Sequence, residues 1–217
     1  MYKTVVFDLD GTLLNTLTDL ADAGNRLCRK YGWPTHERHA YRYFVGNGIP
    51  KLVERLAPAD QRTPAVLEAA LADFKRDYGQ HLRDTTAPYP GIPEMLAKLK
   101  ANGVQLAVFS NKADALAKEV VKDYFGTQYF TIVRGQMTGV APKPAAEGTN
   151  ALLQALHADP ASTLYVGDSN VDVETAHNAN LPCCGAVWGF RTREELNAAG
   201  AEYLAENSDE LYDVIMK

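Results

Sequence analysis

Residues 5–14, Val-Val-Phe-Asp-Leu-Asp-Gly-Thr-Leu-Leu, decide the fold, because an apolar strand ends there in two carboxylates and a glycine. Alternate side chains of an extended chain share a face, so Asp8 and Asp10 are expected to project the same way. Two carboxylates this close repel unless a cation or a shared proton relieves them. The pair is therefore a candidate for divalent-metal binding or for nucleophile and acid–base work. An ordinary turn with solvated acids is the alternative.

Composition limits the classes of function that remain. The 217 residues, 46% of them hydrophobic, suffice for one core domain with an insertion or for two small domains. The net charge is −5 and no run of Lys or Arg is present, so neither nucleic acid nor a membrane is an expected partner. Three cysteines are too few for a disulfide framework. Without a recognisable signal peptide or membrane span, we expect a cytoplasmic monomer or homodimer that acts on a small molecule.

Short apolar runs alternate with helical stretches along most of the chain. Strands are predicted at residues 4–7, 104–109, 130–133, 163–166 and 184–187. Helices are predicted between them at residues 93–102, 113–124, 145–158 and 172–180. This alternation predicts an α/β protein, with a parallel sheet and helices on both of its faces. Ligands of such sheets bind at the carboxyl ends of the strands, where Asp8 and Asp10 are expected.

The first crossover is far longer than a parallel sheet requires. Between residues 15 and 86 only helical patterns are recognised, at 17–31, 49–56 and 65–82. We therefore expect a core domain of residues 1–15 and 87–217 and an inserted all-helical cap of residues 16–86. A cap placed after a reactive strand end suits a lid that excludes water and selects the substrate. A subdomain that only adds core is the alternative.

Polar residues follow three further predicted strands. Ser110 and Asn111 offer a hydroxyl and an amide to a phosphate oxygen, although such a pair also commonly caps a helix. Lys143, between two prolines, offers a fixed ammonium that could balance carboxylates and phosphoryl charge. Asp168 could complete an oxygen-rich magnesium site with Asp8 and a backbone carbonyl. Asp172, one helical turn later, is expected outside the ligand set, where it favours the helix dipole.

Four motifs in this order resemble the haloacid dehalogenase-like hydrolase superfamily over essentially the whole chain. The matching residues are Asp8–Thr12, Ser110, Lys143 and Gly167–Ser169 with Asp172. Within that superfamily the chain is similar to bacterial phosphoglycolate phosphatases, in residues 44–48, 52–56 and 110–112. The resemblance implies a Rossmann-like core with a cap, and Mg²⁺-dependent phosphoryl transfer through an aspartyl-phosphate.

The resemblance also implies roles for single residues. Asp8 is expected to be the nucleophile and Asp10 the acid and base. The metal ligands are expected to be Asp8, Asp10 and Asp168. Gly11, Thr12 and Asn111 are expected to bind substrate, and Ser110 and Lys143 to hold the phosphoryl oxygens.

Substrate choice is expected to depend on the cap. Gly46, Asn47 and Gly48 can form a turn whose N–H groups, helped by Arg42 or Lys51, bind the acid end of phosphoglycolate. A plain helix connector is the alternative. The segment 188–191 could border the site through Arg191, although aromatic loop residues more often pack a domain edge.

Other reactions remain open at this point. A sugar phosphomutase similar to β-phosphoglucomutase, or a pyrophosphatase, would match the core motifs equally well. A receiver that is switched by a long-lived phosphoryl-Asp is the non-enzymatic alternative. The helical insertion and Asp10 both count against such a receiver, because a switch needs neither a lid nor a proton donor.

Overall fold

A computed structural model describes all 217 residues, and the chain divides into two compact units. The core unit comprises Met1–Leu14 and Pro88–Lys217. The second unit, Asn15–Ala87, is called the helical insertion below. No helix in either unit combines the length and hydrophobicity that a bilayer crossing requires.

The core unit is built on a six-stranded parallel sheet in the order β5-β4-β1-β6-β7-β8. The strands are β1 (Thr4–Phe7), β4 (Gln105–Ala113), β5 (Phe130–Gln136), β6 (Thr163–Gly167), β7 (Cys183–Ala186) and β8 (Tyr203–Ala205). Strand β1 lies in the middle, with Phe7 paired to Val108 of β4 and to Val166 of β6. A strand covered on both faces is apolar throughout, which explains the unbroken hydrophobic run before Asp8.

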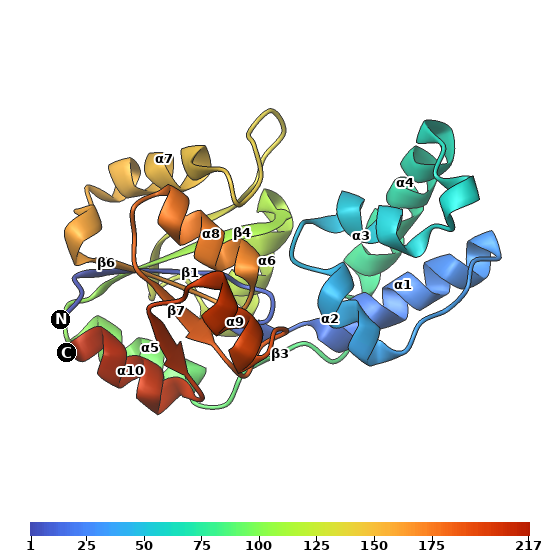
Figure 1. Ribbon diagram of the computed structural model, residues 1–217. Coiled ribbons are helices and arrows are strands. Elements are labelled where there is room, and N and C mark those ends of the chain that lie inside the picture. The colour runs from blue at the N-terminus through green and yellow to red at the C-terminus, as the bar shows by residue number, and fades with distance from the viewer. The chain divides into compact units, whose positions relative to one another are not determined.

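Helices cover both faces of this sheet. They are α5 (Ile92–Ala101), α6 (Asp114–Phe125), α7 (Ala146–Leu156), α8 (Asn170–Asn178), α9 (Arg193–Ala199) and α10 (Ser208–Met216). In Figure 1, α7 and α8 lie on one side of the strands and α5 and α10 on the other. On the first side, Val6, Ala107 and Tyr165 form a buried cluster with leucines of α7. Alternate residues of each strand therefore pack into the hydrophobic cores on opposite faces of the sheet.

The predicted fold class is confirmed, with differences in single elements. Strand β8 was not predicted, because a three-residue edge strand carries too short an apolar pattern to recognise. Helices α9 and α10, on either side of it, were not predicted either. Strand β4 was expected to end at Phe109 but continues to Ala113. Its last residues are polar yet buried, as Ser110, Asn111 and Lys112 are all less than a tenth exposed.

The helical insertion contains four α-helices. They are α1 (Leu17–Tyr31), α2 (Tyr41–Phe44), α3 (Ile49–Leu56) and α4 (Pro64–His81). Gly24 of α1 lets the ring of Tyr41 approach the helix, because a Cβ at this position would collide with that ring. Phe74 and Tyr78 of α4 are fully buried. The insertion therefore has its own apolar centre.

The chain enters and leaves the insertion through two short paired strands, β2 (Leu14–Asn15) and β3 (Ala87–Pro88). Within the insertion, the buried carboxylate of Asp19 ties the start of α1 to the returning chain. Its Oδ1 accepts hydrogen bonds from the backbone N–H (2.9 Å) and the hydroxyl (2.5 Å) of Thr85. Its Oδ2 accepts the same two kinds of bond from Thr86, at 2.9 and 2.7 Å.

Candidate active site

The site residues of the core unit come from the carboxyl ends of three neighbouring strands. Asp8 follows β1, Ser110 lies near the end of β4, and Asp168 follows β6. The backbone N–H of Asp8 donates to the carbonyl of Val166 (2.8 Å), which continues the pairing of β1 with β6 up to the first carboxylate. Strands of different sequence position therefore deliver their polar residues to one edge of the sheet.

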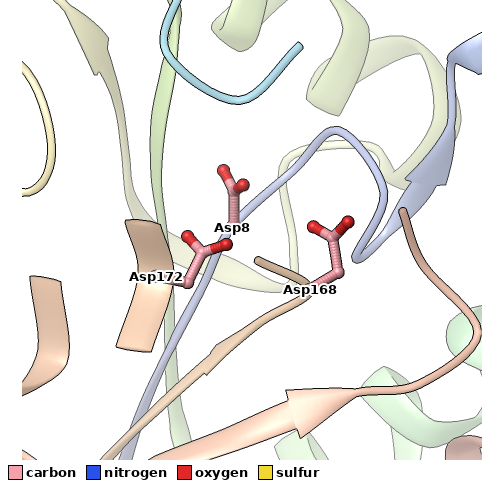
Figure 2. A group of neighbouring side chains, drawn as sticks. All are labelled: Asp8, Asp168 and Asp172. Carbon is pink, nitrogen blue, oxygen red and sulfur yellow. The ribbon is translucent and has the colours of Figure 1, made fainter. Parts of the chain in front are cut away.

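Asp8, Asp168 and Asp172 form a buried acidic cluster at this edge. One carboxylate oxygen from each lies within 4.8 Å of the others, and all three residues are buried. Figure 2 shows the three side chains side by side, with their carboxyl groups turned toward one region. Burial raises the pKa of Asp8 to about 6, against the opposing effect of Lys143. Burial, with Asp172 and Asp8 nearby, raises the pKa of Asp168 well above its usual range.

Lys143 is the buried cation of the cluster. Its Nζ lies 2.7 Å from Oδ1 of Asp172 and 3.0 Å from Oδ1 of Asp8, and its side chain is 1% exposed. It also donates to the hydroxyl of Tyr165 (3.2 Å) and the carbonyl of Phe109 (3.3 Å). Burial alone would lower the pKa of this lysine, but Asp172 and Asp8 hold it well above the ordinary value. Lys143 is therefore a fixed positive charge.

One ammonium does not balance three carboxylates, and the remaining charge suits a hard divalent cation. Oδ1 of Asp8 is buried and accepts no hydrogen bond, although it lies beside the ammonium of Lys143. Carboxylate oxygens in this number are the ligands that Mg²⁺ and Ca²⁺ prefer. The residues present therefore fit such an ion. Asp8 and Asp168 are the predicted ligands that the structure brings together, and Asp172, expected outside the ligand set, lies beside them.

Asp10, the second predicted acid, is not one of the three clustered carboxylates and pairs with another lysine. Nζ of Lys112 is 3.0 Å from its Oδ1 and 3.3 Å from its Oδ2. The Asp10 side chain is 21% exposed, whereas that of Lys112 is 2% exposed. Lys112 was not among the predicted site residues. The similarity of residues 110–112 to phosphoglycolate phosphatases included Lys112 but gave it no role.

The loop after β7 holds Asp168 in place. The backbone N–H of Phe190 donates to Oδ2 of Asp168 (2.7 Å), and the hydroxyl of Thr12 donates to Oδ1 (3.1 Å). Gly11 and Gly189 approach Asp168 so closely that a Cβ on either would collide with its side chain. This loop was expected to border the site through Arg191, but the contact of Phe190 was not predicted, because it depends on a backbone N–H that any residue type carries.

The Trp188–Arg191 segment therefore borders the site rather than only a domain edge. The indole Nε1 of Trp188 donates to the carbonyl of Thr12 (3.0 Å), in the loop after Asp10. Arg191 is 8% exposed. The aromatic residues of this segment also pack, as the alternative expected: the ring of Trp188 lies 6.4 Å from that of Tyr89 between centroids, and Phe190 is buried.

Asn111 anchors the backbone of Lys143 in both directions. Its Oδ1 accepts from the N–H of Lys143 (2.9 Å), and its Nδ2 donates to the carbonyl of the same residue (3.2 Å). Ser110 is 3% exposed, and its hydroxyl oxygen accepts from the backbone N–H of Lys112 at 3.3 Å. The amide predicted to bind substrate thus also positions the lysine of the acidic cluster.

The turn predicted to select the substrate lies in the helical insertion. Gly46 and Gly48 both have positive φ, +109° and +83°, a conformation that favours glycine. Oδ1 of Asn47 accepts a hydrogen bond from Arg55 (2.8 Å), which also donates to the carbonyl of Phe44. Arg55 was not predicted, and it fixes the shape of this turn.

The two cations proposed to assist that turn differ in their surroundings. Lys51 pairs with Glu54 at 2.8 Å, and its side chain is 46% exposed. Arg42 lies in the short helix α2.

Ligands of parallel sheets bind at the carboxyl ends of the strands, and acids with a fixed ammonium at this edge supply the charge and positioning that phosphoryl transfer requires. The chain belongs to the haloacid dehalogenase-like hydrolases, a family that matches residues 5–186. It is a phosphoric monoester hydrolase.

The chain is similar to relatives over almost its full length. It is 31% identical to the phosphoglycolate phosphatase of Chromobacterium violaceum, over 98% of this chain and 96% of the relative. A solved structure from Lactobacillus delbrueckii subsp. bulgaricus superposes with a TM-score of 0.93 at 28% identity, covering 99% of this chain and 98% of the other. A predicted phosphoglycolate phosphatase from Haemophilus somnus gives a TM-score of 0.89 at 25% identity, covering 98% and 97%.

Proposed function

We propose that this enzyme hydrolyses 2-phosphoglycolate, in a Mg²⁺-dependent reaction that passes through an aspartyl-phosphate. The observation that carries the proposal is the buried cluster of Asp8, Asp168 and Asp172, two of which, Asp8 and Asp172, pair with the buried Lys143. The choice of substrate is supported by the relatives, among them the phosphoglycolate phosphatase of Chromobacterium violaceum. A cytoplasmic location and a monomeric or homodimeric state stay predictions from the sequence.

Asp8 is the nucleophile of the proposed reaction. Its carboxylate follows the central strand, and Lys143 holds it at 3.0 Å. Attack on phosphorus requires the ionised form, which the ammonium of Lys143 favours by lowering the pKa of Asp8 against the effect of burial. Asp8 and Asp168, with Asp172 beside them, would hold Mg²⁺, which would neutralise charge between the carboxylate and the phosphoryl oxygens.

Asp10 transfers the protons. Two residues after the nucleophile, its more exposed side chain can reach the leaving oxygen, donate a proton to it and later take one from the attacking water. Ser110 and Lys143, with the N–H groups of residues 9–12, would hold the equatorial phosphoryl oxygens. Positioning and charge then supply most of the rate enhancement.

The test is phosphate release, measured with and without Mg²⁺ on a small panel of substrates. The panel contains 2-phosphoglycolate, β-glucose 1-phosphate, pyrophosphate, a nucleoside monophosphate and an aryl phosphate. We expect Mg²⁺-dependent release with a clear preference for 2-phosphoglycolate. A preference for the sugar phosphate or for pyrophosphate would show that the proposed substrate is wrong and would leave the proposed phosphoryl-transfer chemistry intact. A stable phosphoryl-Asp without phosphate release would show that the protein is a phosphorylated switch and not a phosphatase.

A further inference from the structure

Lys112 is a buried lysine that the chemistry described above does not use. Its Nζ lies 3.0 and 3.3 Å from the two carboxylate oxygens of Asp10, and its side chain is 2% exposed. An ammonium with so little access to water is costly unless an anion balances it. The interior position of Lys112 therefore depends on acidic groups at the active site.

The two buried lysines of the site serve different acids. Lys143 contacts Asp8 and Asp172, which belong to the phosphoryl side of the proposed reaction. Lys112 contacts Asp10, which belongs to the leaving-group side. The Asp10 side chain is 21% exposed and that of Asp8 is 10% exposed, so the Lys112 pair is the more accessible one.

In the proposed substrate, the carboxylate lies close to the ester oxygen that Asp10 would protonate. In 2-phosphoglycolate a single methylene group separates the ester oxygen from a carboxylate. A proton donor at the ester oxygen therefore lies close to that carboxylate, and Lys112 is hydrogen-bonded to this donor, Asp10. A carboxylate next to an ammonium forms a charge-assisted hydrogen bond, which is stronger than a neutral one.

We propose that Lys112 binds the second anionic group of the substrate, and that the core unit thereby selects small phosphate esters with an acidic tail. The inference rests on the proposed phosphatase function, and it names the class of substrate. A lysine suits this task because its flexible stem and compact charge can turn from Asp10 toward a second acid without movement of the backbone. Recognition of the acidic tail was predicted at Gly46–Gly48 in the insertion, whereas Lys112 lies in the core unit beside Asp10.

The experiment compares two substrates that differ only in the group at the tail. Ethyl phosphate carries a methyl group where 2-phosphoglycolate carries its carboxylate. In Lys112→Gln, which can still donate a hydrogen bond to Asp10, the ratio of kcat/KM for 2-phosphoglycolate over ethyl phosphate should fall on the order of 10- to 100-fold. The loss should come mainly from KM, and Lys112→Arg should restore part of it. Lys118→Met removes an exposed lysine and should leave the ratio unchanged.

An equal loss of kcat/KM on both substrates would overturn the inference, because Lys112 would then act only through Asp10. Lys112→Met serves as a second uncharged variant if the glutamine variant does not fold. If the wild-type enzyme releases no phosphate from 2-phosphoglycolate, the proposed function is wrong, and inhibition tests Lys112 separately. 2-Phosphoglycolate should then inhibit hydrolysis of an aryl phosphate about tenfold more weakly in Lys112→Gln, and unchanged inhibition would overturn the inference.

Discussion

The carboxylate of Asp8 is buried beside two other carboxylates and a single ammonium. Replacing it with asparagine removes the nucleophile and one buried negative charge while keeping the shape of the side chain. We expect Asp8→Asn to lower kcat by at least about a thousandfold, because an amide cannot form the acyl phosphate. Thermal unfolding at pH 7.5 should occur at the same temperature as in the wild type or higher. Substantial residual phosphatase activity in a pure sample would refute the nucleophile assignment.

Gly189 touches the same site through its backbone. A Cβ there would meet the side chain of Asp168 and the carbonyl of Gly11. Gly189→Ala should therefore displace Asp168 and lower kcat/KM at least tenfold, with weaker activation by Mg²⁺. Gly79→Ala is the control, because nothing lies within 4 Å of a Cβ at this position in α4. Alanine inside a helix should raise stability by about 0.5–1 kcal/mol and leave activity unchanged. Equal activity in the two variants would contradict the role given to Gly189.

For single residues of the site, some positions could be predicted from the sequence and some contacts could not. Asp8 and Asp168 were predicted because each directly follows an apolar strand, and parallel strands bring their carboxyl ends to one edge. Lys112 and Phe190 were not, since their contacts with Asp10 and Asp168 depend on how distant segments pack. Asp172 was predicted from its place in a first helical turn, which does not reveal that its carboxylate also reaches Lys143.

Helices and strands also differ in how well the sequence predicts them. The five apolar strands of the core and the three longer helices of the insertion (α1, α3 and α4) were predicted from hydrophobic period, because burial on one or both faces imposes that period. The four-residue helix α2 was not predicted. Strand β8 was missed because a three-residue edge strand imposes almost none. The continuation of β4 through Ser110–Lys112 was missed because its buried residues are polar and are satisfied by partners far along the chain.

Helix α1 offers a test at this scale. Asp19 accepts four hydrogen bonds from Thr85 and Thr86, and two of the donors are backbone N–H groups. Asp19→Ala leaves these donors without their partner, so we expect a loss of about 2–4 kcal/mol in the free energy of unfolding. Urea unfolding of the full chain, followed by circular dichroism, measures it. Asp22→Ala, on an exposed position of the same helix, should cost less than about 0.5 kcal/mol. Similar losses in both variants would show that the four hydrogen bonds of Asp19 make no measurable contribution to the free energy of unfolding.

At the scale of the whole molecule, the acidic cluster links stability to pH and to metal. The pKa of Asp8 is raised from 3.8 to about 6 in the folded state, and that of Asp168 is raised as well. Between about pH 4 and 6 the folded state therefore binds more protons than the unfolded state, so its stability falls as pH rises through this window. A shift of about two pKa units corresponds to as much as about 3 kcal/mol.

We expect metal-free enzyme to unfold several degrees lower at pH 7.5 than at pH 5, as measured by thermal unfolding in EDTA. Mg²⁺ should raise the unfolding temperature more at pH 7.5, because it binds the deprotonated carboxylates. Asp168→Asn should reduce both effects. The lowered pKa values of Asp73 and Asp114 affect stability only in more acidic solution, so they leave this comparison intact. A Mg²⁺ effect of equal size at both pH values would contradict the prediction.

The pairing of β2 with β3 has a consequence for how such a protein can diversify. The chain enters and leaves the insertion through hydrogen-bonded neighbouring strands. For the core unit, the 73 residues of Asn15–Ala87 are therefore equivalent to one long loop with its two ends held together. The entropy of closing a loop grows only slowly with its length, so a longer, shorter or differently folded insert costs the parent sheet little. Evolution can therefore replace this segment by another of different length or fold. In the same way, a different segment can be inserted between Leu14 and Pro88 by design while the order of the strands in the sheet stays the same.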